Sequence, residues 1–219
     1  MAMNFEQART NMVENQVRTW DVIDMRVLDV LGRVRREDFV PAEHRQLAFA
    51  DLCLPLGHGE VMMKPVVEGR VLQALELKPT DRVLEIGTGS GFLAACLAGL
   101  AAQVESVDIH ADFTARAGER LAAAGVTNVT LHTGEAVREW QPQGLFDAVV
   151  ATGAVAKVPE RWFGWLKPGA RLLAIRGASP AQQAVLFTRE SDREQREETL
   201  FETDLPYLAH AAPSTAFVF

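Results

Sequence analysis

A glycine-rich turn that directly follows a short apolar stretch constrains the fold of this chain more than any other feature. The apolar stretch covers residues 82–86, and glycines follow at Gly87, Gly89 and Gly91. Glycine has no Cβ atom, so such a turn lets the backbone come close to a ligand. In doubly wound α/β proteins, ligands bind beside this type of turn, at the carboxyl ends of the strands. The segment therefore predicts a strand, a ligand-binding turn and a helix that begins at Phe92.

Apolar stretches of strand length alternate with helical patterns through the rest of the chain. We expect strands at 82–86, 104–108, 129–131, 146–151, 171–175 and 184–188, with a further strand at 216–219. We expect helices at 67–77, 92–100, 111–124 and 162–166, a turn at 168–169, and a solvated loop or hairpin tip at 189–198. This alternation indicates a parallel sheet covered on both faces. The expected fold class is doubly wound (Rossmann-like) α/β.

The first 65 residues differ from the rest and predict an N-terminal helical segment. Residues 4–19 show a weak helical spacing, and Asp24 is placed to cap a second helix that ends near Gly32. Residues 51–65 are rich in glycine and proline, which indicates a structured loop or a short strand pair. We therefore expect a helical segment and loop at 1–65, followed by one compact ligand-binding domain at 66–219.

Charge, hydropathy and residue content argue against several classes of protein. The net charge of -7, without a run of Lys or Arg, argues against nucleic-acid binding. The longest apolar stretch, 92–102, has about 11 residues, fewer than the roughly 20 that span a membrane. The N-terminus lacks the apolar region of a signal peptide, so a cytoplasmic location is expected. The two cysteines are expected to be reduced, and the five scattered histidines predict no metal site.

The charges around the turn indicate which ligand it binds. Asp108 ends the next expected strand about 20 residues later, where a carboxylate can accept hydrogen bonds from both ribose hydroxyls. A dinucleotide turn needs glycine or alanine where this chain has Phe92. Glu85 would repel a diphosphate, but it suits a sulfonium ligand with an α-amino group. The sequence therefore predicts S-adenosylmethionine rather than a nicotinamide dinucleotide.

The ends of the later strands extend the predicted cofactor site. Glu135 is placed to meet an adenine amino group, although the same carboxylate could instead cap a helix. Thr152 is placed to line the floor of the site near the transferred methyl group. The expected cofactor-binding residues are Glu85, Gly87, Thr88, Gly89, Ser90, Asp108, Ile109, Glu135, Ala136 and Thr152.

Eight short segments, spread over nearly the whole chain, together form a recognisable pattern: 24–28, 36–41, 50–51, 54–59, 83–91, 146–154, 158–159 and 166–169. Through them the chain resembles the protein-L-isoaspartate O-methyltransferase family. Residues 36–41 match the family's R-E-x-F-V-P step, and 166–169 match its L-K-P-G turn. The resemblance implies methyl transfer from S-adenosylmethionine to the carboxylate of isoaspartyl or D-aspartyl residues in damaged proteins, which starts their repair. The implied partner is thus a protein or peptide.

The chain departs from the family in the implied substrate loop. The family pattern is close to I-G-x-G-Q-T-I-S-x-P, whereas this chain has Glu60, Val61 and Met63 in place of the Gln, Thr and Ser. The loop residues expected to meet the substrate are Gly59, Glu60, Met62, Met63 and Lys64. The role of the family's serine cannot pass to Met63, so the catalytic residue stays unassigned.

Two further hypotheses remain open beside an isoaspartyl methyltransferase with an altered loop. The first is the same fold with a different, less polar methyl acceptor near Met62 and Met63. The second is a catalytically silent protein that binds the cofactor and acts through other proteins. Lys64 could pair with an acceptor carboxylate, or it could be a solvated surface residue.

Overall fold

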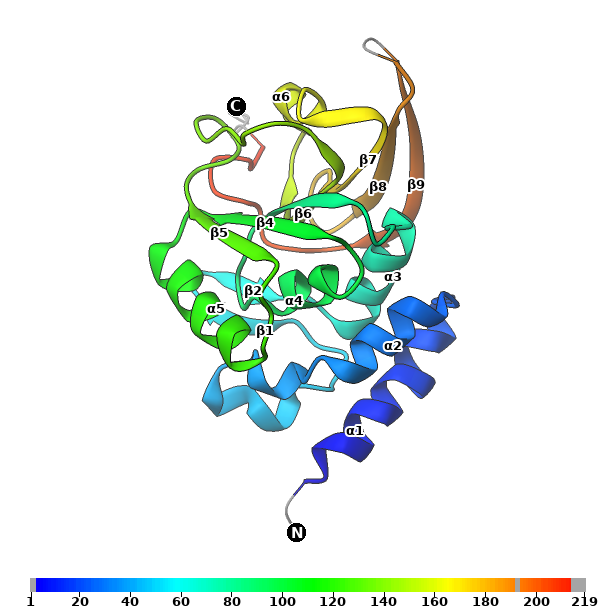
Figure 1. The fold of residues 1–219 in the computed structure, drawn as a ribbon, viewed down its shortest axis with the longest axis vertical. Coiled ribbons are helices and arrows are strands. Elements are labelled where there is room, and N and C mark those ends of the chain that lie inside the picture. The colour runs from blue at the N-terminus through cyan, green and yellow to red at the C-terminus, as the bar shows by residue number, and fades with distance from the viewer. Residues whose placement is uncertain (1–2, 192–193, 214–219) are drawn as a thin grey trace, which may run out of the picture.

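The computed structural model describes residues 3–191 and 194–213, which form a central sheet with covering layers on both faces (Figure 1). The strand expected at 216–219 lies outside the described residues. None of the helices in the described part of the chain is both long enough and apolar enough to cross a membrane.

Seven strands form the central sheet in the order β5-β4-β3-β6-β7-β8-β9. Their bounds are β3 Arg82–Ile86, β4 Gln103–Asp108, β5 Val129–Thr133, β6 Phe146–Val155, β7 Leu166–Arg176, β8 Gln182–Arg189 and β9 Gln195–Thr203. Neighbours from β5 to β7 are parallel, whereas β8 pairs antiparallel with both β7 and β9. From β3 the chain moves outward to β4 and β5, and then returns to the other side of β3 as β6. Such a reversal of strand order is where doubly wound sheets bind ligands.

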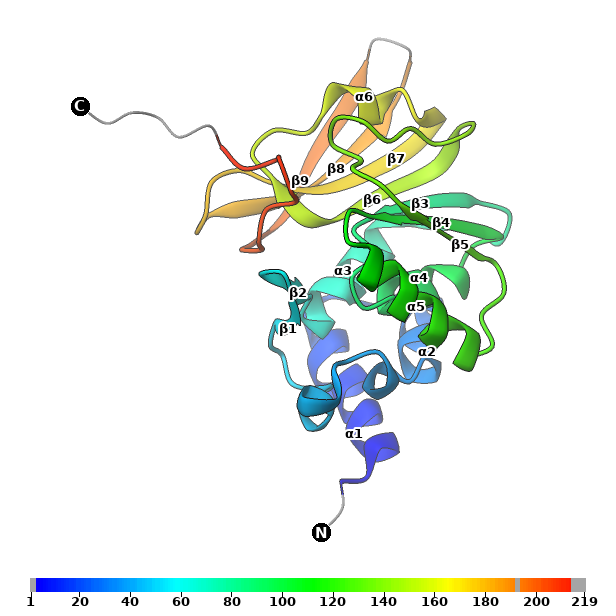
Figure 2. The same cartoon turned by 90° about the vertical axis from the view of Figure 1, so that its left-hand side faces the viewer.

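The two faces of the sheet are covered in different ways (Figure 2). Helices α3 (Pro65–Leu75), α4 (Phe92–Ala98) and α5 (Ala111–Ala123) lie on one face, with the N-terminal elements beyond them. Successive residues of a strand point to opposite faces of the sheet. Val83 therefore packs in the core between the sheet and these helices, and Leu84 packs in the core on the other face, which we call the upper core. The upper core is closed by the short helix α6 (Glu160–Phe163) and by aromatic side chains, including the fully buried Trp162. The expected burial of both faces is confirmed, although long helices cover only one.

The N-terminal segment consists of helical elements and a hairpin. They are α1 (Phe5–Met12), a π-helical turn (Val13–Val17), 3-10 turns (Arg18–Trp20, Arg36–Asp38, Ala42–Leu47), α2 (Met25–Arg33), β1 (Leu54–Gly57) and β2 (Glu60–Met62). Asp24 caps α2 as predicted, since its side chain accepts a hydrogen bond of 2.9 Å from the Arg26 N–H. The strand pair expected within 51–65 is confirmed as the antiparallel hairpin β1–β2. Phe39 of this segment belongs to the same core cluster as Val83 of the sheet.

The helix expected at 162–166 is wrong in its second half. Helix α6 ends at Phe163, and the fully buried Leu166 already pairs with Phe146 as the first residue of β7. The expected turn at 168–169 is a bulge inside β7, where the register shifts so that Ala148 pairs with Arg171. The apolar spacing of residues 162–166 suits a helix. From Leu166 onward, however, the backbone pairs with β6 and is therefore a strand.

A hairpin is confirmed at 189–198, but its connection is shorter than expected, because β8 ends at Arg189 and the antiparallel β9 begins at Gln195. Residues Gln195–Thr203 form β9, which pairs with β8 through Phe187↔Glu197 and neighbouring positions. Its first residues are exposed and charged, so the alternation of apolar and polar residues that marks a half-buried strand is missing. Charged side chains on an edge strand discourage pairing with other chains.

Candidate active site

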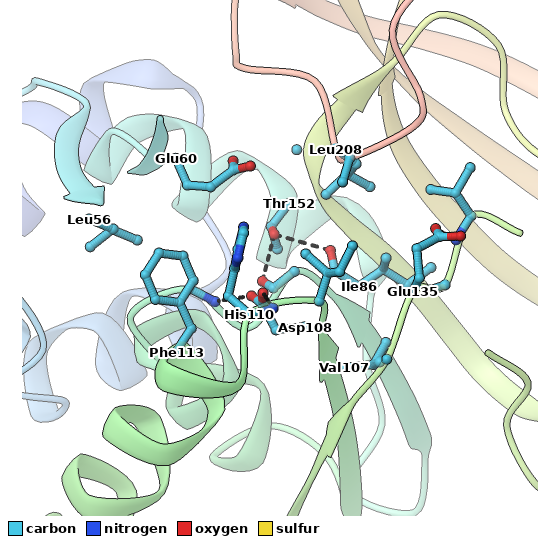
Figure 3. A pocket seen from close by; sticks show the side chains of 18 of the residues that line it. Leu56, Glu60, Ile86, Val107, Asp108, His110, Phe113, Glu135, Thr152 and Leu208 are labelled. Carbon is cyan, nitrogen blue, oxygen red and sulfur yellow. Dashed lines mark hydrogen bonds between the residues drawn. The ribbon is translucent and has the colours of Figure 1, made fainter. Parts of the chain in front are cut away.

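The carboxyl ends of four parallel strands and the β1–β2 hairpin surround one pocket (Figure 3). Its walls come from the turn after β3, the end of β4, the turn after β5, the middle of β6, the hairpin and a late segment of the chain. The residues that the sequence predicted and that line it are Glu60, Gly87, Gly89, Asp108, Ile109, Glu135, Ala136 and Thr152. Residues of the same pocket that sequence reasoning missed include Leu56, His110, Phe113 and Leu208.

The glycines of the turn are needed for close packing against neighbouring elements as well as for ligand access. Gly87 has a φ of 100°, and a Cβ atom there would lie 2.2 Å from the Thr152 hydroxyl oxygen. That hydroxyl donates to the carbonyl oxygen of Gly87 at 2.6 Å, which fastens the turn to β6. Gly91 has a φ of 84°, and a Cβ atom there would lie 2.9 Å from Ala117 of α5. Gly87 and Gly91 are therefore required by packing, and Thr152 fastens the start of the turn to β6.

Asp108 lies at the end of β4 against the glycine turn, and its side chain is buried. One carboxylate oxygen accepts the N–H of Gly89 and the other accepts the N–H of His110, each at 2.9 Å. A carboxylate has about four lone-pair positions, so each oxygen can accept a further hydrogen bond. The two backbone donors hold the carboxylate at the pocket wall and leave it able to accept hydroxyl groups.

Glu85 is fully buried below the turn and has one carboxylate oxygen without a partner. Ser106 donates its hydroxyl proton to Oε2, and the Ser106 and Thr88 hydroxyl oxygens lie 2.6 Å apart. The other oxygen, Oε1, has no hydrogen-bond partner in the described part of the chain. Burial raises the pKa of Glu85 to about 8, with the charges of Asp108 and Glu68 adding to it and the Ser106 hydrogen bond opposing it. An unpartnered buried acid of this kind fits a ligand that brings a positive charge.

The raised pKa of Glu85 predicts how stability depends on pH. An unfolded glutamate has a pKa near 4.5, so between about pH 4.5 and 8 the native state binds more protons than the unfolded state. The free energy of unfolding should therefore fall as the pH rises through this range, by about 1.4 kcal/mol for each unit of pKa shift. We expect Glu85→Gln, which is neutral throughout, to gain stability relative to the parent between pH 5 and pH 8. Urea unfolding at both pH values measures this, and equal pH dependence in the two proteins would contradict it.

A smaller cavity beside the turn contains most of the remaining predicted residues, whereas Gly59 and Lys64 line neither cavity. It is lined by Met62 and Met63 of the hairpin side, by Thr88 and Ser90 of the turn, and by the buried acids Glu68 and Glu85. Ser90 is buried, and its hydroxyl accepts the N–H of Phe92 at 3.2 Å, at the start of α4. This cavity shares Leu56, Val61, Gly87, Gly89 and Thr152 with the larger pocket, so the two adjoin.

The Glu135 carboxylate caps a turn and not a helix, because residues 136–139 form turns. It accepts the N–H groups of Val137 at 2.6 Å and Arg138 at 3.0 Å. The side chain still lines the pocket beside Ala136, so a contact with an adenine amino group remains a prediction.

A buried ion pair holds the loop behind Met63, and sequence reasoning missed it. Arg36 is fully buried and pairs with Glu68 of α3. It also donates to the carbonyl oxygens of Met63 and Ala48, at 2.6 and 2.7 Å. The sequence signal was the presence of Arg36 within the 36–41 motif, but its partner in α3 could not be identified from spacing.

The predicted substrate loop divides into an apolar and a polar part. Met62 and Met63 are buried, while Glu60 is half-buried and faces the pocket. Burial, together with the charge of Asp108, raises the pKa of Glu60. Lys64 is half-buried, directly precedes α3 and lines neither cavity. Gly59 has a φ of 83° at the hairpin tip and lies outside the pocket lining.

The chain matches known proteins along most of its length. Residues 7–205 match the family model described as protein-L-isoaspartate(D-aspartate) O-methyltransferase. A protein-L-isoaspartate O-methyltransferase of Methanoculleus marisnigri is 39% identical over 192 residues, which cover 88% of this chain and 86% of that protein. A second such enzyme, from an Anaeromyxobacter species, is 37% identical over 89% of this chain and 80% of its own length.

A solved structure shows the same fold. It is of a putative protein-L-isoaspartate O-methyltransferase from Plasmodium falciparum in complex with S-adenosyl-L-homocysteine. Its TM-score is 0.80 at 18% identity, with 91% of this chain and 97% of that chain covered. The likeness confirms the expected Rossmann-like methyltransferase fold with its N-terminal helical segment.

Proposed function

Because the chain belongs to the protein-L-isoaspartate(D-aspartate) O-methyltransferase family, it is an S-adenosylmethionine-dependent methyltransferase, and we propose which of its residues bind the cofactor and the isoaspartyl acceptor. Two acids carry the assignment. Glu85 has a buried carboxylate oxygen without a hydrogen-bond partner in the described part of the chain, and the carboxylate of Asp108 lines the adjoining pocket. One end of such a site accepts a cation, and the other accepts hydroxyl groups. S-adenosylmethionine has both in one molecule.

The residues around the two adjoining cavities then take separate roles. The carboxylate of Asp108 accepts the ribose hydroxyls, and the free oxygen of Glu85 faces the α-amino group. Ile109, Glu135 and Ala136 form the adenine side of the pocket. The remaining predicted residues, Gly87, Thr88, Gly89, Ser90 and Thr152, shape the turn between these groups. When bound, the cofactor supplies an electrophilic methyl group on a sulfonium.

The acceptor side needs no strong base. An isoaspartyl carboxylate is ionised at neutral pH and is itself the nucleophile. The task of this chain is to align that carboxylate in a pocket with little water. Met62 and Met63 supply the apolar wall, and we assign to Lys64 the positive charge that attracts the carboxylate in place of the family's serine hydroxyl. This assignment rests on the position of Lys64 directly after Met63, which lines the smaller cavity.

Methyl transfer to a matched pair of peptides tests the acceptor. We expect radiolabelled methyl to reach an isoaspartyl peptide and not the same peptide with a normal aspartyl residue. Lys64→Gln should raise the KM for the isoaspartyl peptide about fivefold with little change in kcat, since a half-exposed ion pair contributes about 1 kcal/mol. Lys78→Gln, which changes an exposed lysine distant from the loop, is the matched control.

Two results would contradict the assignment. No transfer to either peptide, with cofactor bound, would favour a different acceptor. An unchanged KM in Lys64→Gln, with transfer intact, would remove the lysine from the acceptor site and leave the enzyme's activity as stated.

A further inference from the structure

Two histidines and an aspartate from distant parts of the chain meet at the mouth of the cofactor pocket. His58 lies at the tip of the β1–β2 hairpin, His110 immediately precedes α5, and Asp112 is in the first turn of α5. A ring nitrogen of each histidine and a carboxylate oxygen of Asp112 all lie within 4.8 Å of one another. The scattered positions of the histidines in the sequence gave no sign of this cluster, because the hairpin brings His58 to α5 only in the folded chain.

The distances within the cluster suit a small divalent cation. His58 Nε2 and Asp112 Oδ1 are 3.1 Å apart. Zinc binds such donors at about 2.0–2.1 Å in a tetrahedron, which places neighbouring donor atoms about 3.3 Å apart. The rings of His58 and His110 are stacked, with centroids 4.1 Å apart and planes 9° from parallel. Stacked rings direct their nitrogen lone pairs along nearly parallel lines, so one imidazole has to rotate before both nitrogens can point at one ion. His58 is exposed and His110 is half-buried, so His58 is the ring with room to rotate.

The surroundings of the cluster support ligand roles for its members. The second carboxylate oxygen of Asp112 accepts a hydrogen bond of 2.8 Å from Arg116, which leaves Oδ1 directed at His58. Carboxylate ligands of metals are commonly held by such an outer partner. His58 has a φ of 54°, in the left-handed region, where histidine is found more often than most other residues with a side chain. This turn conformation places the imidazole at the hairpin tip, beside α5.

We propose that His58, His110 and Asp112 form a site for a divalent zinc-type cation that ties the β1–β2 hairpin to α5 across the mouth of the cofactor pocket. Three protein ligands leave the fourth tetrahedral position to water. The site also reaches the cofactor side, because the backbone N–H of His110 donates to Asp108. Leu56 and Glu60 of the hairpin face His110 and Phe113 across the pocket (Figure 3), so a bound ion would hold these two walls together.

Calorimetric titration of zinc chloride into the tag-free, chelator-treated chain tests the site. We expect one zinc ion per chain with a dissociation constant in the micromolar range or below. His58→Ala, His110→Ala and Asp112→Asn should each weaken binding at least tenfold. His132→Ala is the matched control, since that imidazole also lies 3.0 Å from a carboxylate, that of Glu105, but is not part of the cluster. Absence of binding, or an equal loss in His132→Ala, would overturn the proposal.

Hydrogen exchange tests whether the ion connects the two elements. Zinc should slow exchange of the backbone amides of residues 57–60 about tenfold in the parent chain and leave them unchanged in His110→Ala. The His110 variant keeps the hairpin ligand, so it separates bridging from binding to the hairpin alone. Zinc binding that leaves these amides unprotected would show that no bridge forms, and the inference would fail.

Discussion

Replacing Asp108 with alanine is expected to weaken binding of S-adenosylmethionine about 100-fold. The proposed role of its carboxylate is to accept two ribose hydroxyls, and hydrogen bonds to a charged group contribute about 1.5–3 kcal/mol each. A 100-fold loss corresponds to about 2.7 kcal/mol, so the estimate assumes that water and the nearby backbone compensate in part. Calorimetry with the cofactor alone measures the effect without any assumption about the acceptor.

The Asp108 experiment needs controls because the same carboxylate holds the N–H groups of Gly89 and His110. Asp108→Asn keeps the size and one acceptor oxygen, so it should bind with intermediate affinity. Asp147→Ala is a matched control, because Asp147 also accepts a backbone N–H, from Arg82 at 2.9 Å. Asp147 lies near the start of β6, at the end of the sheet away from the pocket. The Asp147→Ala chain should bind the cofactor as the parent does. An Asp108→Ala chain that is folded and binds within threefold of the parent would remove Asp108 from the cofactor site.

Replacing Arg36 with methionine is expected to lower the free energy of unfolding by about 3–5 kcal/mol, the cost of breaking a buried ion pair by removal of one partner. Glu68 would remain buried without its counter-charge, and the carbonyl oxygens of Met63 and Ala48 would lose their donor. Burial already raises the pKa of Glu68 to about 7 despite the opposing charge of Arg36. Without the arginine, the carboxyl group should become protonated at neutral pH. Urea unfolding at pH 7 measures the loss.

A double-mutant cycle separates the pair from the loop contacts. Glu68→Leu in the Arg36→Met background should recover part of the stability, because replacing both ions with apolar side chains removes the uncompensated charge. Arg33→Met, at an exposed position of α2, should change stability by no more than about 0.5 kcal/mol. A cost below about 1 kcal/mol for Arg36→Met would show that the pair contributes little to the fold.

Local sequence features predicted the elements that form the proposed cofactor site. The apolar run before the glycines gave β3 with its observed bounds, and Asp108 was placed at the end of the next strand. Since parallel strands bring their carboxyl ends to one edge, the meeting of Asp108 with Gly89 follows from those assignments. The cap at Asp24 and the strand pair within 51–65 were predictable for the same reason, because each depends on neighbouring residues alone.

Features that depend on distant partners were not predictable. The Arg36–Glu68 pair joins a 3-10 turn to α3, and β9 exists because β8 offers an unpaired edge to a charged segment. Leu208 lines the pocket because the chain after β9 returns to β6, where the N–H of Leu208 donates to Ala154 at 2.8 Å. No local pattern marks any of these contacts. The glycine turn therefore predicts where the cofactor binds, while the walls that surround it come from the tertiary fold.

The hydrogen bond from Arg36 to the loop at Met63 has a consequence for how acceptor preference can change in evolution. Its hydrogen bond at Met63 goes to the backbone carbonyl, a group that every amino acid carries in the same place. A serine and a methionine at this position therefore offer the same anchor, and exchange of the side chain leaves the attachment of the loop intact. One codon can thus alter the side chain at the proposed acceptor site while the backbone hydrogen bond that holds the loop is kept.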